Sequence, residues 1–332
     1  MIYVHGLGAV SPAGWGVPAL YRAVQDRTSL PTLALHRPGW PEPLCVLAVP
    51  PPLPIPPFFN HPRMRRASAI SQYAAAAALE ALADSAQPSR LGIIVCVMAG
   101  SVNYSRRFYE QVLKDPATAS PLMFPETVFN APASHLAALL GSNDISYTLV
   151  GDEGAFLQGL ALAAEWLVQG KTEACLVIGA EETDWIVADA MKQFSARSVH
   201  GAGAGALLLK TVSSGALAEL AAITDSFLFT QSQRTERAAR SMRAQLPPCS
   251  PGELLCTSGE EPAEVAAWRD WSAPRFTLKP ILGQAFVASS AWQCVAACQA
   301  LRSDGNPAAN VSVVGANQQA IGARFKQATP HE

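Results

Sequence analysis

The chain has 332 residues, of which 49% are hydrophobic and 15% charged, and its formal net charge is -2 at pH 7. This composition excludes a disordered chain, and it argues against nucleic acid as a partner, because phosphate binding needs clustered excess base. No apolar run reaches the roughly 20 residues that span a bilayer, so we expect no membrane span. The N-terminus has no basic segment, and the seven cysteines include no Cys-x-x-Cys pair. These features predict a cytoplasmic protein with no signal peptide.

Short β-branched apolar runs alternate with longer Ala/Leu-rich runs, a pattern typical of an α/β protein with a buried sheet. A first strand is predicted over residues 2–4 and ends at Gly6-Leu7-Gly8. Residues 66–83 and Ala131–Leu140 predict helices, since neither run is interrupted by glycine. Residues 91–98 carry no polar side chain, which indicates a strand covered on both faces.

Nine prolines fall between residues 41 and 62. Proline lacks the N–H group that helices and sheet ladders need, so this stretch predicts a surface loop or an extended wrap. A ligand for a proline-binding module is the alternative interpretation of the same residues.

Two later segments, residues 145–181 and 275–317, look like copies of each other. Each is a strand–helix–strand unit with glycine at both turns, and repetition of such a crossover builds two similar halves on a shared core. We therefore predict an N-terminal half over residues 1–214 and a shortened C-terminal half over residues 215–332.

The first turn of the earlier copy carries two acidic residues, Asp152 and Glu153, between Gly151 and Gly154. These glycines permit a tight elbow that holds one side chain at the start of the helix. In a catalytic elbow that side chain is Ser or Cys, whereas Glu cannot usefully attack an acyl thioester. The alternative is that both acids only complement the helix dipole.

Several segments, taken in chain order, resemble signatures of the β-ketoacyl-ACP synthase family. They are residues 6–14 (GLGAVSPAG), 63–66 (RMRR) with 72–74 (QYA), 124–133 (FPETVFNAPA), 176–181 (LVIGAE) and 201–207 (GAGAGAL). The resemblance implies the thiolase fold, an α/β fold whose duplicated βαβ-type halves form an α-β-α-β-α layered core. This fold agrees with the internal repeat.

The catalytic groups of that family are a nucleophilic Cys, which takes the acyl chain from a carrier protein, and two His that stabilise the enolate and oxyanion. The resemblance puts Glu153 at the Cys position, Thr257 near the first His position and Gln284 at the second. Lys279, five residues before Gln284, matches a lysine of the family. Because all three catalytic groups are missing, we expect no catalytic residue, no cofactor and no catalysis by the chain alone.

The resemblance implies a chain length factor, a non-catalytic ketosynthase-like subunit that forms a heterodimer with an active β-ketoacyl-ACP synthase and meets an acyl carrier protein transiently. It lies nearest to the subunits of type II polyketide and bacterial aryl polyene systems. Such a subunit shapes the acyl tunnel of its partner, since a packed wall admits no further methylene. The residues expected at the tunnel or interface are Phe124, Phe129, Asn130, His135, Leu140 and Val313. A core histidine is the alternative for His135.

Two groups of arginines are candidates for docking an acidic carrier protein. Arg234 and Arg237 belong to a three-residue repeat on a predicted helix, and Arg63, Arg65 and Arg66 precede the first long helix. A solvated helix face is the alternative for the first group, and a match to the family helix for the second.

Other functions fit the sequence less well. The glycine-rich segments fail the dinucleotide fingerprint, and Cys294 with Cys298 on an Ala-rich helix is a poor metal site, so no metal is expected. His200 is expected to cap or hydrogen-bond locally. The serious rival is a thiolase-fold decarboxylase or acyl-processing enzyme with Glu153 as general base. A helix N-terminus stabilises the ionised form of a carboxylate, which predicts a weak base there.

Overall fold

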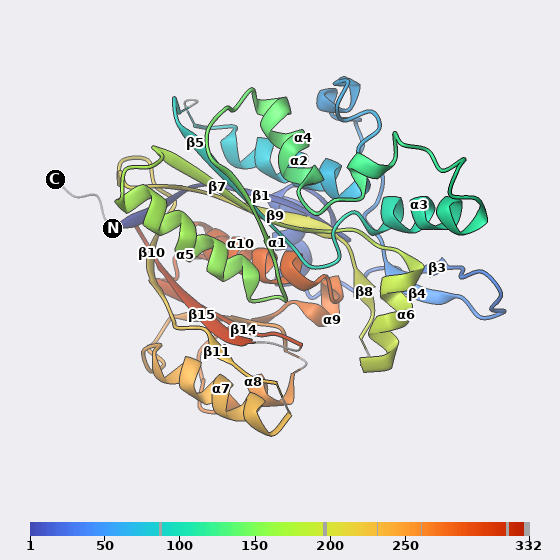
Figure 1. Cartoon of the computed structure of the whole chain (residues 1–332). Coiled ribbons are helices and arrows are strands. Elements are labelled where there is room, and N and C mark those ends of the chain that lie inside the picture. Colours follow the sequence, from blue (N-terminus) through green and yellow to red (C-terminus); the bar gives the residue numbers. More distant parts are fainter. Residues whose placement is uncertain (86–87, 195–197, 231, 260, 317–318, 329–332) are drawn as a thin grey trace.

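The computed structural model describes residues 1–332 except 86–87, 195–197, 231, 260, 317–318 and 329–332 (Figure 1). Its strands form a mixed sheet of 12 strands and a small sheet of three. The strands are β1 (Ile2–Ser11), β2 (Gly14–Trp15), β3 (Leu33–Leu35), β4 (Leu44–Leu47), β5 (Leu91–Val97), β6 (Ser146–Val150), β7 (Ala174–Glu181), β8 (His200–Gly201), β9 (Gly203–Lys210), β10 (Ala218–Ile223), β11 (Phe227–Leu228), β12 (Leu254–Thr257), β13 (Arg275–Thr277), β14 (Ala308–Val314) and β15 (Gln319–Lys326). The helices are α1 (Val17–Gln25), α2 (Ala69–Leu82), α3 (Val102–Lys114), α4 (Ala131–Leu140), α5 (Ala155–Val168), α6 (Trp185–Phe194), α7 (Ser232–Ala244), α8 (Pro262–Ala267), α9 (Lys279–Leu282) and α10 (Phe286–Ser303), with 3-10 turns η1 (Pro57–Asn60) and η2 (Phe124–Glu126).

The large sheet consists of two halves with the same strand order. One half runs β6-β5-β7-β9-β1 and the other β13-β12-β14-β15-β10. In each half the first three strands are parallel and the last two antiparallel, and antiparallel pairing of β1 with β10 joins the halves. The units β6–α5–β7 and β13–α10–β14 are therefore topological copies, as the sequence repeat predicts. The predicted boundary after residue 214 falls between β9 and β10 and stays a prediction.

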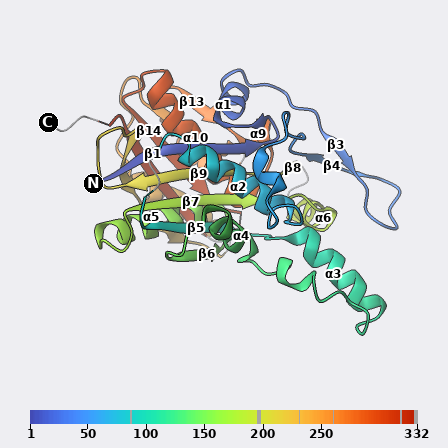
Figure 2. The same cartoon turned by 90° about the horizontal axis from the view of Figure 1, so that it is seen from above.

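The core has five layers, which confirms the predicted α-β-α-β-α arrangement (Figure 1). Helices α2 and α4 cover the outer face of the first half-sheet, and α7 and α8 cover that of the second. Helices α5 and α10 lie between the half-sheets. Seen from above, α3 extends away from this core (Figure 2).

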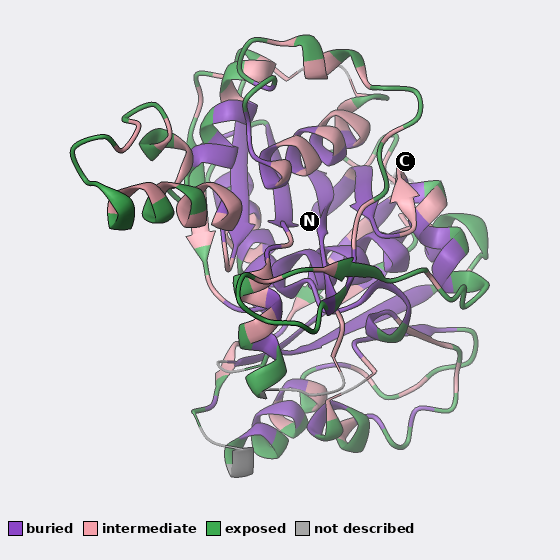
Figure 3. Ribbon diagram, turned by 90° about the vertical axis from the view of Figure 1, so that its right-hand side faces the viewer, coloured by how far each residue is buried: buried purple, intermediate pink, exposed green. Residues whose placement is uncertain are grey.

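Helix α10 is apolar on nearly all sides because half-sheets and helices enclose it. The indole Nε1 of Trp292 donates to the carbonyl oxygens of Val10 and Ala204, both at 3.0 Å, and so ties the helix to β1 and β9. The burial colouring shows the central strands almost uniformly buried, whereas α3 is exposed or half-buried (Figure 3). This rigid centre fixes the turns at the ends of the strands.

Strand β1 continues to Ser11, so the predicted end at Gly6-Leu7-Gly8 is wrong. Gly6 and Gly8 do not form a turn; they allow helix α2 to pack closely against the strand. A Cβ atom on Gly6 would lie 1.7 Å from the carbonyl oxygen of Ala81, and one on Gly8 would lie 1.8 Å from that of Ala77. Only glycine lets this helix lie against the strand.

The other predicted elements agree with the structure to different degrees. Helix α4 matches its predicted bounds, α2 lies within residues 66–83, and β5 is buried at every position. Residues 41–62 are irregular except for β4 and η1. The predicted surface loop or extended wrap is interrupted at β4, which pairs with β3 and β8 and packs against α6.

Candidate functional site

The corresponding turns of the two repeat units meet at one buried site. Glu153 follows β6 at the start of α5, and Gln284 lies between α9 and α10. Glu153 is 2% exposed, and its Oε1 accepts hydrogen bonds from Lys279 Nζ at 3.0 Å and from Gln284 Nε2. Ser290 Oγ, from α10, donates to the carbonyl oxygen of Glu153 at 2.6 Å. The resemblance assigned three residues to the lost catalytic positions and a fourth to the family lysine. The structure brings three of these four together, namely Glu153, Gln284 and Lys279.

The turn that carries Glu153 is held from the second half-sheet. Asp152 Oδ1 accepts hydrogen bonds from the Gly154 N–H at 3.1 Å and from Gln319 Nε2 at 3.0 Å. A Cβ atom on Gly315 would lie 2.0 Å from Asp152 Oδ2, so glycine is required at the end of β14 for this approach. Residues distant in sequence therefore fix the direction of the Glu153 side chain.

Burial raises the pKa of the Glu153 carboxyl, although Lys279 and Gln284 oppose this shift. The net shift is therefore opposite to the one expected from the helix N-terminus, because desolvation outweighs the stabilising contacts. Burial also raises the pKa of Glu264, with opposition from the hydroxyls of Ser258 and Ser312 and from Lys279. A single ammonium group thus serves two buried carboxyls, which favours a proton on one of them.

Glu264 organises the neighbouring strand end. Its Oε2 accepts from the backbone N–H of Ser258 at 3.0 Å, from the Ser258 hydroxyl and from the N–H of Gly259 at 3.2 Å. Its Oε1 accepts from Ser312 Oγ at 2.8 Å. This network and the contact of Ser290 were not predicted from the sequence. Polar residues within otherwise apolar runs were the only available signal.

Thr257, the residue assigned near the first lost His, is the last residue of β12 and is buried. Its carbonyl oxygen accepts from the Leu278 N–H at 3.2 Å, which holds the segment leading to Lys279. Its Oγ1 makes no hydrogen bond to any described residue. Thr257 therefore supports the lysine segment through its backbone.

The predicted tunnel and interface residues fall into separate groups. Phe124, Phe129 and Asn130 are exposed around η2 and the start of α4. His135 is buried, and its Nε2 lies 2.8 Å from Glu126 Oε2. Leu140 packs against the core outside the first half-sheet, and Val313 belongs to the core around α10.

The candidate docking arginines lie on opposite outer layers. Arg63, Arg65 and Arg66 are exposed before α2, and Arg234 and Arg237 are exposed on α7 (Figure 1). A later member of the α7 repeat, Arg243, is half-buried. Its guanidinium carbon lies 4.3 Å from the ring centre of Trp268, and Nη1 donates to the Leu246 carbonyl at 3.0 Å. The repeat is thus partly structural.

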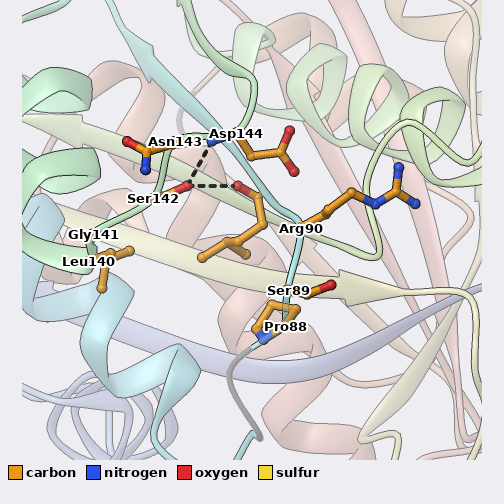
Figure 4. A pocket seen from close by; sticks show the side chains of 9 residues that line it. Pro88, Ser89, Arg90, Leu140, Gly141, Ser142, Asn143 and Asp144 are labelled. Carbon is orange, nitrogen blue, oxygen red and sulfur yellow. Dashed lines mark hydrogen bonds between the residues drawn. The ribbon is translucent and has the colours of Figure 1, made fainter.

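A polar pocket of about 570 Å³ lies at the amino ends of β5 and β6, away from Glu153 (Figure 4). Ser142 Oγ donates to the Leu91 carbonyl oxygen at 3.2 Å and accepts from the Asp144 N–H at 3.4 Å. Arg90, on its rim, lies 3.8 Å from Glu173. Ser142 and Arg90 thus make local contacts in this pocket, which is separate from the candidate site.

Two further features concern the described residues only. None of their helices is long and apolar enough to cross a bilayer. No three of their His, Cys, Asp or Glu side chains gather in a group that could hold a metal ion.

No protein-family model matches the sequence, and no curated protein matches it significantly. Solved structures nevertheless match almost the whole chain. The ishigamide ketosynthase/chain length factor is 18% identical with a TM-score of 0.80, covering 99% of both chains. A β-ketoacyl synthase from Burkholderia phymatum is 16% identical with a TM-score of 0.80, also covering 99% of both. A type II PKS acyl-carrier protein in complex with its ketosynthase bound to the hexaketide gives 18% identity and a TM-score of 0.77 over 98% of this chain and 99% of that chain. The chain therefore has the thiolase fold of ketosynthases and chain length factors.

Proposed function

We propose that this protein is a non-catalytic ketosynthase-like subunit, a chain length factor that pairs with an active β-ketoacyl-ACP synthase in polyketide or aryl polyene biosynthesis. The observation that carries the proposal is the position of Glu153. The family resemblance assigns Glu153 to the position of the nucleophile, and Lys279 and Gln284 hydrogen-bond its carboxyl.

The chemistry of this closed site supports the absence of an acyl-enzyme step. A carboxylate that accepts two hydrogen bonds in a buried site is a poor nucleophile toward a thioester. Burial raises the pKa of the thiols of Cys96, Cys175 and Cys256, so these groups stay protonated and unreactive. A role in assembly fits such a site better than a role in group transfer.

The edge of the first half-sheet supports pairing with a second thiolase-fold subunit. Strand β6 ends the sheet, and its Tyr147 and Val150 side chains are 53% and 55% exposed. An exposed apolar edge strand is a template for pairing with another chain. A groove of about 510 Å³ between β6 and α4 continues this surface toward Asn130, and Phe129 is exposed beside it. We infer that the active ketosynthase covers β6 and α4, and that Phe129 contributes to the wall of its tunnel.

Co-expression with a ketosynthase partner tests the pairing. The variant Tyr147→Lys places a charge on the exposed edge and is expected to abolish co-purification of the two subunits, while its own unfolding midpoint stays unchanged. Leu228→Lys on β11, which is also exposed, is the matched control and should pair as the wild type does. Unimpaired pairing of Tyr147→Lys would refute β6 as the interface.

The raised pKa of Glu153 favours one alternative, a decarboxylase with this residue as general base. The two functions differ in the behaviour of the isolated chain. Incubation with malonyl-carrier protein should release no carbon dioxide if the chain is a non-catalytic subunit. Turnover that is lost in Glu153→Ala would establish the decarboxylase and overturn the proposal.

A further inference from the structure

A second polar pocket, of about 670 Å³, is lined by β1, the start of α1, the ends of α2 and α10, and the linker from β9 to β10. Its volume is in the range of ligand sites. Lys210, which lines it, pairs with Ala174 at the amino end of β7, whereas Glu153 follows the carboxyl end of β6. Because β6, β5 and β7 are parallel, this pocket and the candidate site lie at opposite ends of these strands.

Strand β1 pairs with β9 along most of its length, but its other side is open in the middle. There β10 pairs only with the first residues of β1, and β2 only with the last. Ala9 faces the open side, since its N–H donates to Glu80 Oε2 and its carbonyl oxygen accepts from the Gly16 N–H, both at 2.8 Å. Backbone groups alternate between the two sides of an antiparallel strand, so the N–H and C=O of Leu7 face the open side as well. No described residue hydrogen-bonds them there, and Leu7 lines the pocket.

The pocket also holds two cations. The side chains of Lys210 and Arg302 make no hydrogen bond or ion pair with a described residue. Burial lowers the pKa of His5, the Val212 carbonyl opposes this shift, and the charge of Lys210 adds to it, so Lys210 lies near His5. Arg302 also complements the C-terminal end of α10. Lys210 is therefore the principal group for an anionic ligand.

Two acids line the same pocket, but only one of them is free to oppose an anion. The carboxylate of Glu80 accepts from the N–H groups of Ala9 and Val17, both at 2.8 Å, and so joins β1 to the start of α1. Asp84 is exposed near the end of α2. Two cations thus face one free acid, and Glu80 shows that a carboxylate fits against the open side of β1.

We propose that this pocket binds an extended peptide segment that ends in a free carboxylate. One residue of the segment pairs its N–H and C=O with those of Leu7, which extends the sheet on the open side of β1. The terminal carboxylate lies against Lys210 and Arg302 in charge-assisted hydrogen bonds. The site belongs to this chain alone and lies away from Glu153, so it does not depend on the proposed pairing.

Titration of the isolated chain with N-acetyl-dialanine, followed by NMR at low salt, tests the proposal. We expect this probe to bind about tenfold more tightly than N-acetyl-dialaninamide, which keeps the peptide groups but lacks the charge. Lys210→Gln should remove most of this preference and Arg302→Gln part of it, whereas Lys114→Gln on the exposed face of α3 should not change it. Absence of binding to the wild type, equal binding of the two probes, or a full preference in the variant that combines Lys210→Gln and Arg302→Gln would overturn the site.

The pairing with Leu7 needs its own comparison, made with the ligand because a change in β1 endangers the fold. Methylation of the first amide nitrogen of the probe removes the N–H that donates to the Leu7 carbonyl, and it should weaken binding about tenfold. Methylation of the second amide nitrogen is the matched control, since that N–H points away from β1 in an extended segment. Equal losses from the two methyl groups would show that the carboxylate alone is recognised and would exclude the extension of the sheet.

Discussion

The two repeat units have the same topology but differ at their ends. Strand β6 of the first unit is an exposed edge, whereas β13 of the second is shorter and half-buried, with Arg275 donating to the Trp268 carbonyl at 2.8 Å. The helices differ as well, because α10 is buried almost throughout while α5 keeps exposed positions. The two units therefore share the layers of the fold, whereas their edges and turns differ.

The turns show what this divergence produced. Each unit contributes one side of the buried site, with Glu153 from the first and Gln284 from the second, and a hydrogen bond joins them. Polar residues thus meet at a place where the fold brings two equivalent turns into contact. Lys279 also pairs with Glu153 there, with its Nζ 3.0 Å from Oε1.

The largest effect is expected where the outer helices meet the half-sheets. Gly8→Ala would place Cβ 1.8 Å from the backbone of α2. Gly322→Ala on β15 would meet the flexible ends of Leu246 and Met242 at 2.9 and 3.0 Å and the Val311 carbonyl oxygen at 3.1 Å. We expect Gly8→Ala to lower the free energy of unfolding by about 4 kcal/mol or more and Gly322→Ala by about 1 kcal/mol. Urea denaturation measures both, and equal losses would contradict the difference between the outer layers.

The next effect concerns the ion pair that connects the two units. Lys279→Met leaves Glu153 and Glu264 without their shared cation, so the free energy of unfolding at pH 7 should fall by about 3 kcal/mol. Lys326→Met, an exposed lysine on β15, should change it by less than about 0.5 kcal/mol. Adding Glu153→Gln to Lys279→Met should recover part of the loss, and strictly additive losses in this double-mutant cycle would exclude the coupling.

The sequence predicted the fold better than the site because the two depend on different information. Family-like segments and a repeated strand–helix–strand pattern are local, and they predicted the layers, α4 and the buried strand β5. The pairing of Glu153 with Lys279 joins residues 126 positions apart, which no local pattern specifies. The end of β1 was mispredicted because Gly6 and Gly8 serve helix packing, and a glycine gives the same local signal in a turn.

A smaller effect distinguishes the strand ends of the two units. β7 ends in the buried Glu181, whereas β14 ends in Val314. Burial raises the pKa of Glu181 from 4.5 to about 8, against hydrogen bonds from the N–H groups of Met98 and Ala99. The folded state therefore keeps a proton that the unfolded chain has lost, so stability falls as pH rises through this range.

The expected slope of the unfolding free energy is at most about 1.4 kcal/mol per pH unit. Glu181→Gln should flatten the profile between pH 5 and pH 8 in urea titrations, and Glu219→Gln on β10 is the control that should leave it unchanged. A wild-type profile that rises with pH across this range would contradict the assignment of a protonated Glu181.

The smallest effect compares the two arginine groups as docking sites for an acidic carrier protein. Arg63, Arg65 and Arg66 precede α2, whose Ile70 N–H donates to Glu182 at the carboxyl end of β7, so they lie near the edge that holds the candidate site. We expect the triple change of these arginines to Glu to slow association with the carrier about tenfold at low salt. The effect should vanish at about 0.5 M salt, because the Debye length is then only a few ångströms. Reversal of Arg234 and Arg237 on α7 should leave the rate unchanged, since that helix covers the opposite outer layer. A salt-dependent loss in the α7 variant alone would move the docking surface to the second half of the molecule.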